Sequence, residues 1–304
     1  MKKIIVLLSA LLFAGVVSSE VKHITTSDGV VLHVTVKGQG IPCLYLHGGP
    51  GSGSHWLEKF MGDSLEQYFQ MIYLDQRGVA RSSSPADGNY SMARMVQDFE
   101  EVRLALGIEQ WLTMGHSFGG LLQMGYVLEH PGSIKGMLMI NAALDMTECF
   151  ESSWCPKSLE FLALEGNDLC HDTEKPLIEK WMFLIQELNE QGLFWKMGYA
   201  DEQNMHTMNA SFGEIADWNW EMGSVAMDFD DYYRNFKPYT AGITTPVLFY
   251  YGKSDWMIGP KHYLGADFPK LLLWGSDSGH MPFMESQEDL MNALRAFVKR
   301  FSIK

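Results

Sequence analysis

The chain has 304 residues, of which 46% are hydrophobic and 20% are charged, a composition typical of a globular protein rather than a disordered or fibrous one. Its length suits one large α/β domain or a domain that carries an insertion. The net charge of −14 excludes the usual basic surface of a nucleic-acid-binding protein, because acidic groups repel phosphate backbones.

The first 19 residues have the pattern of a signal peptide. Lys2 and Lys3 precede an apolar run from Ile4 to Val17, and small residues lead to a cleavage point before Glu20. A membrane anchor is the alternative, but a helix that crosses a bilayer takes roughly 20 apolar residues, and this run is shorter. We expect an exported chain, periplasmic or secreted, without stable membrane insertion. Cleavage leaves 21 basic and 37 acidic residues, a net charge near −16.

A rhythm of strands and helices runs through the first half of the chain. Strands are predicted at 30–36, 42–46, 71–74, 111–114 and 136–140, and a helix at 92–106 with Ser91 as its N-cap. This alternation is typical of a mostly parallel sheet that helices cover on both faces.

The rhythm stops at about residue 144, and the chain is helical and aromatic up to residue 236, with Pro176 opening a long helix. Strand character returns at 246–251 and 270–274, and an amphipathic helix follows at 288–300. We predict an α/β sheet domain made of residues 20–143 and 237–304, with a helical cap, residues 144–236, inserted after about the sixth strand.

The four cysteines fall into two groups. Cys43 lies in an apolar run and is expected to be a small buried side chain. Cys149, Cys155 and Cys170 lie in the cap, and two of these three can pair in an exported protein, although the sequence leaves the pairing open. No Cys-x-x-Cys or His-Glu-x-x-His pattern occurs, so the sequence supports no metal site.

Ser117 is the candidate nucleophile. It lies in Gly115-His116-Ser117-Phe118-Gly119, a Gly-x-Ser-x-Gly pattern between a predicted strand and a predicted helix. Such a serine sits on a turn too tight for side chains two positions away, so glycines flank it. The helix that begins there directs its positive end at the reacting oxygen.

Asp255 and His280 are the candidate acid and base. Each follows a predicted strand, and the order Ser, Asp, His is the one this kind of site uses. The carboxyl ends of parallel strands meet at one edge of the sheet, so we expect the three side chains to converge there. Asp277 is a competing acid that lies in the same loop as His280, and we rank it below Asp255.

The loop His47-Gly48-Gly49-Pro50-Gly51 follows another strand and leaves backbone N–H groups free to face a substrate oxygen. We expect the N–H groups of Gly49 and Phe118 to form an oxyanion hole.

Three segments together resemble the prolyl iminopeptidase family of α/β-hydrolases, which release N-terminal proline or other residues from peptides. They are His47-Gly48-Gly49-Pro50-Gly51, Asp75-Gln76-Arg77-Gly78 with Arg81-Ser82, and Gly115-His116-Ser117-Phe118-Gly119-Gly120. The resemblance covers both parts of the sheet domain and little of the cap.

The resemblance implies an α/β-hydrolase fold in which Ser117, Asp255 and His280 form the triad and Gly49 contributes to the oxyanion hole. It also implies cap carboxylates that hold the substrate's amino group, and Glu221, in Trp220-Glu221, is the candidate. The chain departs from the family at Ala80, where glycine is usual, and at Phe118, where tryptophan is usual.

We therefore predict a serine hydrolase that acts through an acyl-enzyme and needs no cofactor. Its substrate is expected to be a small peptide, as for an aminopeptidase of prolyl iminopeptidase type. A carboxylesterase or lactonase on the same scaffold is the alternative, because fold does not fix substrate. A binding protein without turnover is a third hypothesis, which an intact triad disfavours.

Overall fold

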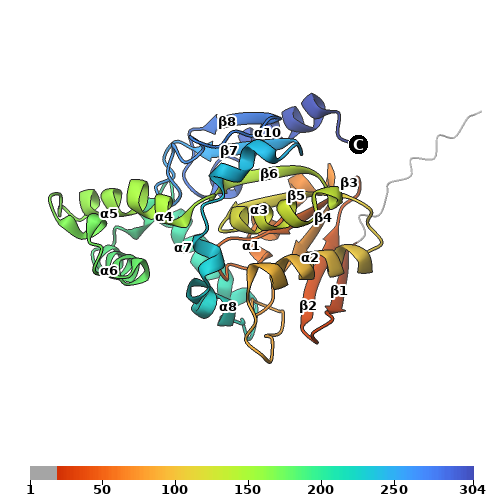
Figure 1. Ribbon diagram of the computed structural model, residues 1–304, viewed down its shortest axis with the longest axis horizontal. Helices are drawn as coiled ribbons and strands as arrows, with labels where there is room; N and C mark the ends of the chain where they lie inside the picture. The colour runs from red at the N-terminus through yellow and green to blue at the C-terminus, as the bar shows by residue number, and fades with distance from the viewer. Residues whose placement is uncertain (1–18) are drawn as a thin grey trace, which may run out of the picture.

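The computed structural model describes residues 19–304 and contains one eight-stranded sheet (Figure 1). The strand order is β1-β2-β4-β3-β5-β6-β7-β8, and all neighbours from β4 to β8 in that order are parallel. The first two pairings, β1 with β2 and β2 with β4, are antiparallel. The strands are β1 Ser19–Thr25, β2 Val31–Lys37, β3 Ile41–Leu46, β4 Phe69–Leu74, β5 Trp111–Ser117, β6 Ile134–Ala142, β7 Val247–Gly252 and β8 Leu271–Ser276.

Helices cover both faces of this sheet because its central strands are apolar on both sides. In β3, Leu44 and Leu46 pack on one face, whereas Cys43 and Tyr45 pack on the other. The first face is covered by α2 (Met92–Ala105) and α3 (Gly119–Glu129). The second is covered by α1 (His55–Leu65), α9 (Pro282–Glu285) and α10 (Gln287–Phe301). The predicted α/β-hydrolase architecture is thus confirmed.

The predicted elements agree with the structure in type, and their bounds differ by a few residues. The Ser91 side chain accepts a hydrogen bond from the Arg94 N–H and caps α2 as predicted. In the sheet domain, β1, α1 and α9 were missed. Strand β1 is an edge strand with a mostly exposed surface, and α1 follows the glycine-rich loop directly.

The segment between β6 and β7, residues 143–246, is helical and is called the insert below. Its α-helices are α4 Met146–Cys149, α5 Cys155–Phe161, α6 Leu177–Glu190, α7 Glu202–Ser211 and α8 Glu221–Val225. In the view of Figure 1, α5 and α6 lie to the left of the sheet. A disulfide between Cys155 and Cys170 ties α5 to the turn that precedes α6.

The remaining cysteines are free thiols. Cys43 is fully buried, as predicted, and Cys149 is buried beside His262, with its Sγ 3.6 Å from the His262 Nδ1. Burial raises the pKa of both thiols well above its usual value. Neither thiol is therefore a ready nucleophile, because the thiolate is the reactive form.

The predicted signal peptide, residues 1–19, lies outside the described residues except for Ser19, which begins β1. Within residues 19–304, no helix combines the length and the apolar character needed to span a bilayer.

Candidate functional site

Ser117 lies at the sharp turn between β5 and α3. Its φ of 56° is in the left-handed region, which a residue other than glycine occupies only when the surrounding structure holds it there. Close packing explains two of the glycines around it. A Cβ atom on Gly48 would lie 2.7 Å from the Ser117 Cβ, and one on Gly119 would lie 2.1 Å from the Leu46 carbonyl oxygen. Ser117 therefore stands exposed to the cavity at the end of a tightly packed turn.

The structure brings Asp255 and His280 together. The His280 Nδ1 lies 3.0 Å from the Asp255 Oδ2, and both side chains are almost fully buried. The other carboxylate oxygen, Oδ1, accepts hydrogen bonds from the backbone N–H groups of Met257 and Ile258. Each carboxylate oxygen thus has a defined partner, and the imidazole is held in one orientation.

The competing acid Asp277 lies elsewhere. Its side chain is 90% exposed and pairs with Lys253 Nζ at 2.7 Å. An ion pair at this exposure contributes little to stability, and it leaves Asp277 no part in orienting His280.

His280 lies beside the turn that carries Ser117. The ring of His116 is 4.6 Å from the ring of His280, centre to centre, and the His116 Nε2 donates a hydrogen bond of 2.8 Å to the His280 carbonyl oxygen. Burial lowers the pKa of His116 to about 3, so its ring is neutral at neutral pH. Within residues 19–304 no hydrogen bond joins Ser117 to His280, a contact that in many unliganded enzymes forms only with substrate.

The predicted oxyanion donors, Gly49 and Phe118, both line the cavity into which Ser117 opens. Neither backbone N–H donates a hydrogen bond to any other group of the described chain. Such N–H groups need a partner, and a substrate oxygen can supply one. The φ of Gly49 is 111°, a conformation that glycine adopts without strain.

The glycine-rich loop is held in place by the buried carboxylate of Asp75. Ser54 donates two hydrogen bonds to its Oδ1, from the backbone N–H and from the hydroxyl, and Arg81 Nε binds its Oδ2 at 2.6 Å. Burial raises the pKa of Asp75, but these partners outweigh it and bring the pKa below its usual value. The Asp-Gln-Arg-Gly segment therefore acts as a structural brace.

His47, at the start of the same loop, has a structural role. Its Nδ1 lies 3.0 Å from the Gly48 carbonyl oxygen, and its Nε2 accepts a hydrogen bond from the Gln76 N–H. Full burial lowers the pKa of His47 to about 4. Both ring nitrogens are engaged within the protein, so His47 is a neutral linker between the two loops.

Ala80 has a φ of 50°, in the region that favours glycine. Its backbone N–H and carbonyl bond to Asn219 of the insert, which fixes this conformation. The glycine usual at this position in the prolyl iminopeptidase family thus has a physical reason.

Asn141, at the end of β6, connects the loops that carry Asp255 and His280. Its Oδ1 accepts a hydrogen bond from the Gly252 N–H at 2.7 Å, and its Nδ2 donates one to the Gly279 carbonyl at 2.8 Å. Asn141 is buried and has a φ of 44°. The sequence prediction missed this residue, although an asparagine that ends a buried strand in this fold is a usable signal.

The insert supports the same two loops through its backbone. The Met197 carbonyl accepts a hydrogen bond from the Trp256 N–H, and the Gly198 carbonyl accepts one from the His280 N–H at 2.7 Å. His280 itself, and Trp256 next to Asp255, are therefore hydrogen-bonded to the backbone of the insert.

A cavity of about 390 Å³ lies between Ser117 and the insert. This volume is in the range of small-molecule sites. Its lining residues are Gly49, Pro50, Ser117, Phe118, Met146, Trp154, Ile178, Trp181, Met182, Ile185, Phe194, Gly223, Met227, Met257 and Ile258. The ring of Phe118 lies 4.8 Å from that of Tyr232.

Glu221 is not among these residues. It is exposed at the start of α8, and its backbone N–H is bonded to the Asn219 Oδ1. Gly223, two residues later, does line the cavity. The structure thus brings the α8 backbone to the cavity without the predicted carboxylate.

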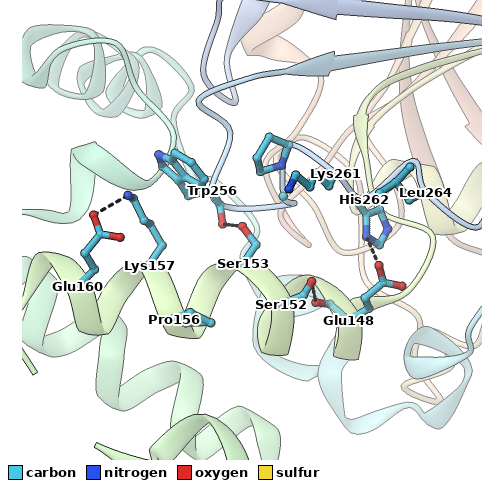
Figure 2. A pocket seen from close by; sticks show the side chains of 12 residues that line it. Glu148, Ser152, Ser153, Pro156, Lys157, Glu160, Trp256, Lys261, His262 and Leu264 are labelled. Atoms are coloured by element: carbon cyan, nitrogen blue, oxygen red, sulfur yellow. Dashed lines mark hydrogen bonds and ion pairs between the residues drawn. The ribbon is translucent and has the colours of Figure 1, made fainter. Parts of the chain in front are cut away.

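A separate hollow of about 510 Å³ has the opposite character, since most of its side chains are polar or charged (Figure 2). Figure 2 shows Lys157 paired with Glu160, and His262 directed at Glu148. Glu148 also pairs with Lys237, and the hollow contains none of the residues predicted from the sequence. Within residues 19–304, no group of three or more His, Cys, Asp or Glu side chains is arranged to hold a metal ion.

Comparison with known proteins agrees with this geometry. Residues 42–287 match the alpha/beta hydrolase fold family, a span that includes every predicted site residue. The chain belongs to this family. Proline iminopeptidase from Neisseria gonorrhoeae is 37% identical over 102 residues, which is 33% of this chain and 32% of that protein. The matched segment thus spans about a third of the relative's length. The resemblance to the prolyl iminopeptidases is therefore confirmed over about a third of the chain.

Solved structures show the same fold over almost the whole chain. A proline iminopeptidase-related protein from Thermus thermophilus has a TM-score of 0.76 at 19% identity and covers 93% of this chain and 98% of its own. An esterase from Rhodococcus has a TM-score of 0.69 at 20% identity and covers 92% and 99%. At these identities the likeness establishes the hydrolase fold alone.

Proposed function

We propose that this protein is a serine hydrolase that transfers the acyl group of its substrate to Ser117 and then to water. The observation that carries the proposal is the buried Asp255–His280 pair, held at 3.0 Å beside the Ser117 turn. In the proposed reaction Asp255 accepts a hydrogen bond from the His280 Nδ1, which leaves Nε2 free to take the Ser117 proton.

The remaining steps use the side chains of Ser117 and His280 and two backbone N–H groups. Ser117 attacks the substrate carbonyl carbon, and the N–H groups of Gly49 and Phe118 bind the oxygen as it gains negative charge. One such donor typically lowers the barrier by roughly 3 to 4 kcal/mol. His280 then gives the proton to the leaving group, and it activates a water molecule that releases the acyl group from Ser117.

Two substrate classes are candidates. An aminopeptidase of prolyl iminopeptidase type is supported by the relatives over a third of the chain. A carboxylesterase or lactonase is supported by the cavity, because among the described residues that line it neither Glu221 nor any other carboxylate is present to hold a substrate amino group. The geometry supports the ester class better. We also propose, from the N-terminal pattern, that the protein is exported and acts in the periplasm or outside the cell.

Hydrolysis of nitrophenyl esters and of aminoacyl-naphthylamides by wild type and Ser117→Ala tests the proposal. Ser152→Ala is the matched control, since Ser152 is exposed and lines the other hollow. We expect a fluorophosphonate probe to label the wild type and Ser152→Ala but not Ser117→Ala, and ester turnover to follow the labelling. Equal turnover by Ser117→Ala and wild type would refute the serine mechanism.

A further inference from the structure

Apart from Ser117, the side chains that line the cavity beside it are apolar. Among the described residues that line it, none carries a charge, and four are methionines. An ammonium or carboxylate group placed there would lose its hydration without gaining an opposite charge, which is costly in free energy. Methionine side chains are flexible and adapt to apolar ligands of irregular shape. The lining thus favours an uncharged, apolar substrate group.

One wall of the cavity is a stripe along α6. Ile178, Met182 and Ile185 follow one another at spacings of four and three residues, so they lie on one face of the helix. The stripe is about 10 Å long, given a rise of 1.5 Å per residue. Ile178 is 39% exposed and Met182 is 56% exposed, although both are large apolar side chains. Apolar side chains left exposed at the rim of a cavity are typical of a ligand-binding surface.

We propose that this cavity binds the acyl part of the substrate and selects an uncharged, apolar acyl chain of medium length, with Ile178 and Met182 as specificity-determining residues. The inference rests on the proposed function, because the acyl chain enters the cavity when its carbonyl carbon is at Ser117. Short acyl groups reach only the inner part near Phe118, whereas longer ones extend along the α6 stripe. Aminoacyl groups are disfavoured because their ammonium has no partner in the lining.

The test uses a series of nitrophenyl esters, from acetyl through butyryl to octanoyl, with alanyl- and prolyl-naphthylamide beside them. The variants are Met182→Asp and, as matched control, Phe183→Asp. Phe183 is the next residue on α6 and is also exposed, at 43%, but it does not line the cavity. Both substitutions are at exposed positions, so both proteins are expected to fold.

For the wild type we expect kcat/KM to rise at least tenfold from the acetyl to the octanoyl ester, since the added methylenes are buried along the stripe. Met182→Asp should lower kcat/KM for the octanoyl ester about tenfold and leave the acetyl ester within twofold. Phe183→Asp should match the wild type on both.

The two proposals fail in different ways. Ser117-dependent hydrolysis with no dependence on chain length, or with a preference for the aminoacyl amides, overturns the acyl-chain inference and leaves the serine hydrolase standing. Equal losses in Met182→Asp and Phe183→Asp also overturn it, because the stripe would then have no special role. Hydrolysis that survives Ser117→Ala overturns the proposed function itself.

Discussion

Replacing Asn141 by alanine should separate the two loops that carry Asp255 and His280. The substitution removes two hydrogen bonds and leaves the Gly252 N–H and the Gly279 carbonyl, both buried, without their partner. Each unsatisfied group costs about 1 to 3 kcal/mol. Alanine at a φ of 44° adds about 1 kcal/mol, since asparagine tolerates this conformation better. We expect the free energy of unfolding to fall by about 3 to 7 kcal/mol.

The effect on turnover follows from the same geometry. Asn141 does not line the cavity, so KM should change little, whereas a looser Asp255–His280 pair should lower kcat about 10- to 100-fold. Urea unfolding measures the loss of stability, and ester hydrolysis is followed at a temperature where the variant is fully folded. The exposed Asn209 in α7 gives the matched control, Asn209→Ala.

A milder variant keeps the test informative if the alanine variant does not fold. Asn141→Ser brings no charge, and its hydroxyl can replace one of the two hydrogen bonds, so its losses should be smaller in both measurements. If folded Asn141→Ala retained kcat within twofold of the wild type, the bridge would not position the pair, and our reasoning would be wrong.

The other predictions concern stability. The pKa values of His47 and His116 lie near 4 and 3 in the folded protein, and each takes up a proton near pH 6.5 when unfolded. Below pH 6.5 the unfolded chain therefore binds more protons than the folded protein. The free energy of unfolding should fall by about 1.4 kcal/mol per pH unit for each histidine as the pH drops from 6.5 towards 4. Chemical denaturation at several pH values measures this fall, and a free energy of unfolding that does not change with pH would contradict it. Replacing Cys155 and Cys170 by serine opens a loop that the disulfide closes over a separation of 15 residues, and it should lower the free energy of unfolding by about 3 kcal/mol. The melting temperature should fall, and the wild type with its disulfide reduced should show the same fall. Ala80→Gly should change the free energy of unfolding by less than about 1 kcal/mol, because relief of the left-handed conformation is offset by the loss of a buried methyl group and by the greater freedom of the unfolded chain. A large shift of the melting temperature in either direction would argue against this.

Much of the fold and the core of the candidate site were predictable because local pattern and topology agree. Ser117 was recognised from a strand-turn-helix context, and Asp255 and His280 from their places after strands. Parallel strands end at one edge, so three residues far apart in sequence could be expected to meet. Strand β1 was missed because it lies at the edge of the sheet, where none of its side chains is fully buried.

Other features depend on tertiary contacts that leave little trace in the sequence. Cys155 pairs with Cys170 because the fold brings their Cα atoms to within 5.7 Å, and the spacing of cysteines along the sequence does not predict this distance. Cys149 instead faces His262. The Trp-Glu pattern pointed to Glu221, but the way α8 meets the sheet decides that its backbone, and not this carboxylate, reaches the cavity.

The hydrogen bonds from the Trp256 and His280 N–H groups to the Met197 and Gly198 carbonyls restrict how the insert could be exchanged. A chimera that took its insert from another hydrolase would need backbone carbonyls placed where those of Met197 and Gly198 lie, so that the Trp256 and His280 N–H groups keep their hydrogen-bond acceptors. The bond at position 197 uses only the backbone carbonyl, whereas the Met197 side chain is fully buried and packs in the hydrophobic core of the insert, so a graft would need an apolar residue of similar size there. Position 198 is different: a side chain there would lie 2.8 Å from the His280 Cβ, so successful grafts would be expected to carry glycine at this place.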